Sequence, residues 1–170
     1  NSEGQTDVTA GNDFVAISAG DFHNMALKCD GSLVVWSTVG QVIGAPSDNG
    51  FVAIDAGWGQ DLALKSDGSM VGWGWNDKGQ ATARPGTNFV AVATGWRHSL
   101  ALKSDGSLVA WGLNDSGQTN APVGTNFVAI AAGFQLSLAI QVQPPVLNIA
   151  QNGNNIVLSW STNHNGYTLE

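Results

Sequence analysis

Short apolar stretches alternate with tight-turn residues along most of the chain. Residues 89–93 form a β-branched and aromatic run, and residues 99–103 alternate large and small side chains with a period of two. Asp105-Gly106 separates the second run from the apolar residues 108–111. Asp-Gly between two such runs is a strong hairpin signal, because both positions of the favoured two-residue turn take positive φ. The pattern therefore predicts β-strands joined by hairpins, and none of it has helical spacing.

The same pattern is repeated along the chain. Its first residue recurs as Phe14, Phe51, Phe89 and Phe127, at spacings of 37, 38 and 38 residues. Units of about forty residues with four short strands are typical of β-propeller blades, whereas the turns of a β-helix are shorter. We expect the fourth strand in the segment that begins at Gln118 and its equivalents. The sequence predicts an all-β fold: a partial β-propeller with three full four-stranded blades and two half blades, in an open arc whose uncovered edges favour association.

The repeat also sets the expected boundaries. Residues 1–13 match the tail of a unit, since Asn1–Gln5 is similar to Asn114–Gln118. The expected segments are full units at 14–50, 51–88 and 89–126, a partial unit at 127–140, a proline-containing linker at 141–145, and the first three strands of a β-sandwich at 146–170. The last segment is similar to the start of an immunoglobulin-like or fibronectin type III-like domain, with Trp160 in its core. Because such a sandwich needs about 100 residues, we expect the chain to be a fragment of a parent chain that supplies the remaining blades.

The third copy carries the most complete motif. It reads Gly95-x-x-His98-Ser99-Leu100-Ala101-Leu102, Asp105-Gly106 and Trp111-Gly112-x-Asn114-x-x-Gly117-Gln118. From residue 1 to about 140 the chain resembles the regulator of chromosome condensation repeat, in the compact form common in bacterial secreted proteins. The resemblance implies a β-propeller, usually of seven blades, in a secreted or cell-surface protein. The histidine of the motif is only partly kept, since its position reads His23, Gln60, His98 and Leu136.

Composition excludes several classes of partner. The net charge is −7 and no basic run occurs, so the chain lacks the lysine and arginine cluster that a nucleic-acid groove needs. No apolar run approaches the roughly 20 residues of a membrane-spanning helix. The single cysteine, Cys29, takes the place of a turn serine in the other copies, and we interpret it as incidental.

No catalytic or metal-binding constellation stands out. His23 and His98 occupy equivalent positions in different blades, which favours structural hydrogen bonding over metal ligation. The Asp-Gly-Ser turns lack the spaced acids of a calcium loop, and no nucleophile elbow occurs. Asp61 replaces the serine kept at Ser99 and Ser137, and on its own it is a poor candidate for a general base. The sequence therefore predicts no catalytic residue, no metal and no cofactor.

An aromatic residue lies just after the glycine that ends the first strand of every copy. The candidate binding residues are Phe22, Trp58, Trp96, Arg97 and Phe134. If these loops share one face of the propeller, they form an aromatic rim for a protein or glycan ligand. The alternative is that each ring only packs against the adjacent blade.

The function predicted on these grounds is a non-catalytic binding or adhesion scaffold, a propeller module of a larger secreted or cell-surface protein. The family resemblance implies one alternative, guanine-nucleotide exchange on a small GTPase, although no position here matches a motif for that activity. A polysaccharide-acting propeller enzyme is the other alternative, and the sequence offers no paired carboxylates for it.

Overall fold

The computed structural model describes residues 10–36, 44–142, 147–152 and 155–160, and all regular structure within them is β. Each sheet is antiparallel, with strands paired in chain order. Blade 1 consists of β1 (Phe14–Ala19), β2 (Asn24–Lys28) and β3 (Leu33–Trp36); blade 2 of β4 (Phe51–Ala56), β5 (Gln60–Lys65) and β6 (Met70–Gly74); blade 3 of β7 (Phe89–Thr94), β8 (His98–Lys103) and β9 (Leu108–Gly112); and blade 4 of β10 (Phe127–Ala132) and β11 (Ser137–Gln141). A separate hairpin contains β12 (Leu147–Asn152) and β13 (Asn155–Trp160).

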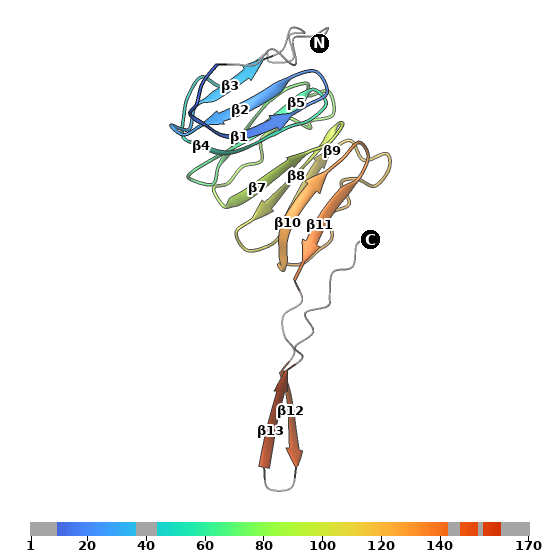
Figure 1. The fold of residues 1–170 in the computed structure, drawn as a ribbon. Coiled ribbons are helices and arrows are strands. Elements are labelled where there is room, and N and C mark those ends of the chain that lie inside the picture. The colour runs from blue at the N-terminus through green and yellow to red at the C-terminus, as the bar shows by residue number, and fades with distance from the viewer. Residues whose placement is uncertain (1–9, 37–43, 143–146, 153–154, 161–170) are drawn as a thin grey trace.

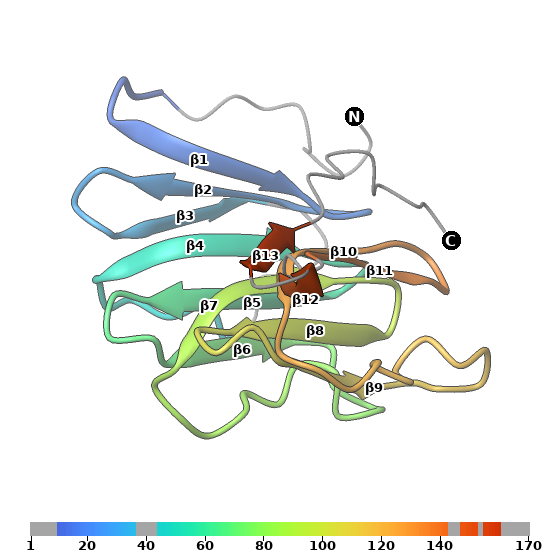
Figure 2. The ribbon, with the colours of Figure 1, turned by 90° about the horizontal axis from the view of Figure 1, so that it is seen from below.

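The four blades fan out from a common side (Figures 1 and 2). The first strands β1, β4, β7 and β10 contact one another in succession and so line the inner side of the arc. The middle strand of each blade contacts the first strand of the next, as β2 does with β4 and β5 with β7. The prediction of an all-β fold with a partial, open propeller is confirmed.

The hydrophobic core lies between blades. One cluster joins Met25 and Leu27 of blade 1 to Phe51, Ala63 and Trp73 of blade 2. A second joins blades 2 and 3 through equivalent residues: Leu62, Leu64, Met70, Phe89, Ala101 and Trp111. Each blade therefore depends on its neighbour to bury its apolar face, as expected for a repeat architecture.

The Asp-Gly hairpins form where predicted, but with a different turn. Gly31, Gly68 and Gly106 have φ near +80°, whereas no described non-glycine residue has positive φ. The aspartate instead stays in a conformation in which its side chain accepts hydrogen bonds from the backbone and hydroxyl of the serine two residues on, as Asp67 does with Ser69 at 2.9 and 2.6 Å. The link is thus longer than the two-residue turn predicted, and only its glycine requires left-handed geometry.

The predicted fourth strand is not formed in blades 2 and 3, which have three strands each. The segment after β9 folds into a turn held by its own side chains. Asn114 accepts a hydrogen bond from the backbone N–H of Thr119 at 2.9 Å, and the Ser116 N–H donates to the Gln118 side chain at 2.9 Å. These local bonds take the place of a strand ladder. In blade 1 the corresponding residues 37–43 lie outside the described part.

The C-terminal segment forms the hairpin of β12 and β13, with Leu147 opposite Trp160. The third strand predicted there, residues 167–169, lies outside the described residues. The sandwich domain therefore stays a prediction. The described part contains no helix long and apolar enough to cross a membrane.

Candidate functional site

Glycines at the ends of the inner strands let the blades approach closely. A Cβ on Gly20 would lie 2.4 Å from the carbonyl oxygen of Gly57, and one on Gly95 would lie 2.4 Å from that of Gly133. The backbone N–H groups of Trp58 and Trp96 donate across the blades to the oxygens of Gly95 and Gly133, at 3.4 and 3.2 Å. These glycines are needed for close approach, and the residue after each is held at the same level in its blade.

The aromatic residues predicted from the sequence lie together in one row across the four blades. The ring centroids of Phe22 and Trp58 are 5.9 Å apart with an interplanar angle of 68°, and those of Trp58 and Trp96 are 6.0 Å apart at the same angle. Trp96 and Phe134 stack at 4.6 Å with an angle of 18°. Such edge-to-face and stacked pairs each add roughly 0.5–1.5 kcal/mol beyond the area that they bury. We call Phe22, Trp58, Trp96 and Phe134 the aromatic row.

Two further side chains extend the row. Trp75, which follows β6, lies 4.7 Å from Trp58, and it was not among the residues predicted for the site. Its equivalent in blade 3 is Leu113. The aromatic residue in place of leucine was the sequence feature that could have identified Trp75 as a candidate site residue. The Arg97 guanidinium lies 5.1 Å from the Trp75 ring centroid and 5.3 Å from that of Trp96, and forms an ion pair with Asp77 at 3.0 Å. The five predicted site residues are therefore contiguous, with Trp75 and Asp77 added to them.

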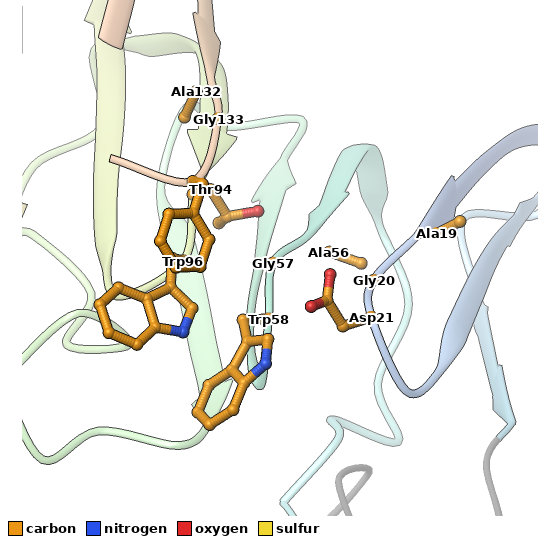
Figure 3. A pocket seen from close by; sticks show the side chains of 12 residues that line it. Ala19, Gly20, Asp21, Ala56, Gly57, Trp58, Thr94, Trp96, Ala132 and Gly133 are labelled. Carbon is orange, nitrogen blue, oxygen red and sulfur yellow. The ribbon is translucent and has the colours of Figure 1, made fainter. Parts of the chain in front are cut away.

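A pocket of about 220 Å³ opens at the inner ends of the four blades. Equivalent positions line it: Ala19, Ala56, Thr94 and Ala132, the four glycines Gly20, Gly57, Gly95 and Gly133, and Asp21, Trp58, Trp96 and Phe134. Figure 3 shows the indoles of Trp58 and Trp96 side by side on one side of the pocket, and the carboxylate of Asp21 beside Gly57. The site thus combines an apolar rim, backbone groups and one exposed carboxylate.

Polar side chains link successive blades beneath this site. His23 Nε2 lies 2.6 Å from Asp61 Oδ1, and both side chains are fully buried. His98 Nε2 lies 3.1 Å from Ser137 Oγ, which itself donates to the Gln118 carbonyl at 2.7 Å. The structural hydrogen-bonding role predicted for the two histidines is confirmed, and Asp61 is a member of an inter-blade pair.

Gln60 has the same role at the interface between blades 2 and 3. Its amide donates at 2.8 Å to the carbonyl oxygen of Gly95, which also accepts from the backbone N–H of Trp58. Every blade interface therefore contains a polar link from the same repeat position.

Burial raises the pKa of two carboxyl groups in these interfaces. Desolvation raises the pKa of Asp61, and the hydrogen bond and charge of His23 oppose this change. Desolvation likewise raises the pKa of Asp55, whose carboxylate accepts from the backbone N–H and hydroxyl of Thr94 at 2.6 and 2.9 Å and from the Ser18 hydroxyl at 3.2 Å. By contrast, the hydrogen bonds from Ser69 lower the pKa of Asp67 in its exposed turn.

We expect the two kinds of carboxyl to give opposite pH dependence. Between the ordinary aspartate pKa of about 4 and its own raised value, Asp55 holds a proton in the folded chain that it loses in the unfolded chain. Its contribution to the free energy of unfolding therefore decreases as pH rises through that window. Asp55→Asn, which keeps an acceptor for Thr94, should become more stable relative to the wild type as pH rises.

Asp67→Asn is the control of opposite sign. The lowered pKa of Asp67 stabilises the folded wild type above the unfolded-state pKa, and this stabilisation is lost on acidification. The free energy of unfolding of Asp67→Asn should therefore decrease relative to that of the wild type as pH rises. Chemical denaturation at several pH values measures both. An Asp55→Asn curve parallel to that of the wild type would contradict the assignment.

The described residues include no group of three or more histidine, cysteine or acidic side chains placed to hold a metal ion. Cys29 is exposed and unpaired with another cysteine there. The groups at the site are aromatic rings, a guanidinium and backbone carbonyls, all of which make non-covalent contacts. Such groups bind a partner through burial, cation–π contacts and hydrogen bonds.

Comparison with known proteins agrees with the fold. The model of the regulator of chromosome condensation (RCC1) repeat matches residues 14–37 and 89–118. A comparison with curated protein sequences gave no match.

Solved structures of similar fold include two plant receptor ectodomains and a yeast protein, Prp20p. The CRINKLY WD40 ectodomain of the receptor kinase ACR4 from Arabidopsis thaliana is 26% identical, with a TM-score of 0.63 over 76% of this chain and 46% of that one. Prp20p from Saccharomyces cerevisiae is 19% identical, with a TM-score of 0.68 over 82% and 46%. The ectodomain of the receptor kinase CR4 from Physcomitrella patens is 20% identical, with a TM-score of 0.62 over 83% and 41%. The chain spans less than half the length of these three structures.

Proposed function

Starting from repeats of the RCC1 type folded as part of a β-propeller, we propose that the chain is a non-catalytic binding scaffold. Its contact surface is the aromatic row together with Trp75 and Arg97. The observation that carries the proposal is the continuous series of ring contacts across all four blades, in which Trp58, Trp96 and Phe134 also line the inner pocket. Aromatic residues and arginine are the residue types most enriched at the energetic centres of interfaces.

The geometry of the rings favours a protein or peptide over a glycan. Stacking on a sugar requires a free ring face. Trp58 has Trp75 tilted against it at 4.7 Å, and Trp96 has Phe134 stacked on it at 4.6 Å. These neighbours cover one face of each ring, and the most exposed rings of the group are those of Trp75 (39%) and Phe134 (62%). Apolar rings beside a guanidinium suit the side chains of a polypeptide.

The similar structures are consistent with a protein partner. The Prp20p structure was described with its binding to Gsp1p and histones, and the plant structures are receptor ectodomains. For this chain we propose a module of a larger secreted or cell-surface protein, in which residues 146–170 begin a sandwich domain. An export signal in the full reading frame would support that location, and its absence would contradict it.

Alanine at the two central tryptophans tests the binding surface. Peptides selected from a display library on the immobilised chain should lose at least about thirtyfold in affinity for Trp58→Ala and for Trp96→Ala, the size of an interface hot spot. Val123→Ala, an exposed change away from the row, is the control and should bind as the wild type does. Circular dichroism and thermal unfolding check that each variant is folded.

Four outcomes separate the alternatives. Reduced affinity in a folded variant supports the binding row. Reduced stability with unchanged affinity would mean that the rings only pack against adjacent blades. Release of labelled GDP from a loaded small GTPase on addition of the chain would favour the exchange activity instead, and selection on a glycan array in place of peptides would contradict the preference for a polypeptide.

A further inference from the structure

The inner pocket contains one carboxylate at a repeat position that is otherwise aromatic. The residue after the glycine that ends the first strand is Asp21 in blade 1, and in blades 2 to 4 it is Trp58, Trp96 and Phe134. All four line the pocket, whereas Phe22 lies one position further along and contacts Trp58 in the aromatic row. Among the described residues that line the pocket, Asp21 alone carries a charge. The pocket therefore combines apolar rings with a single negative group.

The carboxylate of Asp21 is available to a ligand. The side chain is exposed, and within the described part of the chain it has no hydrogen bond or ion pair. Other aspartates in the blades are already engaged: Asp55 accepts from Thr94, and the turn residue Asp67 accepts from Ser69. Asp21 thus differs from them in having a free acceptor at the mouth of a pocket.

Close packing of the loops places this carboxylate next to the rings. A Cβ on Gly20 would lie 2.4 Å from the Gly57 carbonyl oxygen, so the loops of blades 1 and 2 touch immediately before Asp21 and Trp58. The Trp96 ring centroid lies 6.0 Å from that of Trp58 on the next loop, and Figure 3 shows the three side chains on successive loops. A negative group at one end of an apolar wall matches a side chain that has an apolar stem and a positive head.

We infer that the pocket binds a lysine or arginine side chain of the partner, an inference that rests on the proposed polypeptide-binding function. The cationic head pairs with Asp21 through charge-assisted hydrogen bonds, and the methylene stem lies along the indoles of Trp58 and Trp96. The pocket volume of about 220 Å³ is below the roughly 300–1,000 Å³ of small-molecule sites and suits one side chain. The net charge of −7 attracts a basic partner at longer range.

The neighbouring charges leave this preference intact. Arg97 does not line the pocket, and Asp77 offsets its positive charge in an ion pair at 3.0 Å. An acidic ligand group would have to displace Asp77 from that pair and would meet Asp21 in the pocket. A hard metal ion needs several oxygen ligands, whereas one carboxylate lines this pocket in the described part of the chain. An organic cation is therefore the ligand group that fits.

Peptides selected on the immobilised chain from a display library of random sequences are the probe. We expect one position of the selected peptides to be lysine or arginine. Replacing that residue with its neutral isostere, norleucine or citrulline, should weaken binding at least about tenfold, and Asp21→Asn should cause a similar loss, as for other hydrogen bonds to charged groups. Asp115→Asn is the matched control, because it removes the same charge from an exposed turn outside the pocket, and it should bind as the wild type does.

Combining the two changes tests whether the groups meet. If Asp21 pairs with the basic residue, Asp21→Asn should cost little further affinity toward the neutral peptide. Added salt should also weaken wild-type binding more than binding to Asp21→Asn. Additive losses, or an equal loss for Asp115→Asn, would overturn the inference. Circular dichroism confirms that the variants fold.

The same experiment distinguishes this inference from the proposed function. Selected peptides that lack a basic residue, or that bind Asp21→Asn as tightly as the wild type, would overturn the inference. The binding scaffold would still stand if those peptides depend on Trp58 and Trp96. Failure to select any peptide that depends on the two tryptophans would overturn both proposals.

Discussion

Replacing Asp61 with alanine is expected to lower the free energy of unfolding by about 3 kcal/mol, the upper end of the range for leaving a buried hydrogen-bonding group without its partner. Asp61 and His23 are both fully buried, and only 2.6 Å separates their nearest polar atoms. Alanine removes the acceptor of the His23 Nε2 hydrogen bond and leaves the imidazole in a dry interface. Burying the Asp61 side chain has a desolvation cost. Removing that side chain is also destabilising, because His23 then loses its hydrogen-bond partner in a buried site.

The chain provides its own control for this experiment. At the interface between blades 3 and 4, His98 and Ser137 occupy the positions that His23 and Asp61 occupy between blades 1 and 2. The His98 Nε2 atom lies 3.1 Å from Ser137 Oγ. Asp61→Ser should therefore recreate an observed pair and recover a large part of the loss, to within about 1–2 kcal/mol of the wild type. Tryptophan fluorescence in urea, at one protein concentration because association changes apparent stability, gives the comparison. If Asp61→Ser lowers the free energy of unfolding as much as Asp61→Ala does, the hydrogen bond to His23 is not the source of the stability that Asp61 provides.

The architecture could be predicted from the sequence because each repeat contains the same pattern of strand and turn residues. Apolar runs with a period of two and an Asp-Gly turn define the hairpins. The regular spacing of the copies, 38 residues from Phe51 to Phe89, indicates that the hairpins stack as repeats. The fourth strand could not be predicted in this way. Whether Asn114 and Gln118 bond to a neighbouring strand or to their own turn depends on local side-chain geometry, which the apolar pattern does not contain.

Most of the ring contacts involve residues that the sequence singles out. Trp58, Trp96 and Phe134 share one repeat position, Phe22 lies one position further along, and Arg97 follows Trp96. Trp75 was missed because it comes from another position in the repeat and meets Trp58 only after β6 returns toward β5.

The pairing of His23 with Asp61 was missed for a related reason. Taken alone, an aspartate in place of serine is simply a variant. The pair is recognised only when positions one repeat apart, His23 with Asp61 and His98 with Ser137, are compared as neighbours across a blade interface.

A pair of leucines at one repeat position measures what a neighbouring blade contributes to stability. Leu62 on β5 is fully buried in the cluster between blades 2 and 3, and Leu62→Ala is expected to cost about 2–5 kcal/mol. Leu138 on β11 occupies the same position but is 43% exposed, and Leu138→Ala should cost less than about 1 kcal/mol. Both losses are measured by urea unfolding at one protein concentration, because association changes apparent stability.

The repeat position, the residue type and the substitution are the same, so the difference between the two losses in the free energy of unfolding reports the contribution of the blade that covers Leu62. Equal losses for Leu62→Ala and Leu138→Ala would contradict a stabilising contribution from that blade.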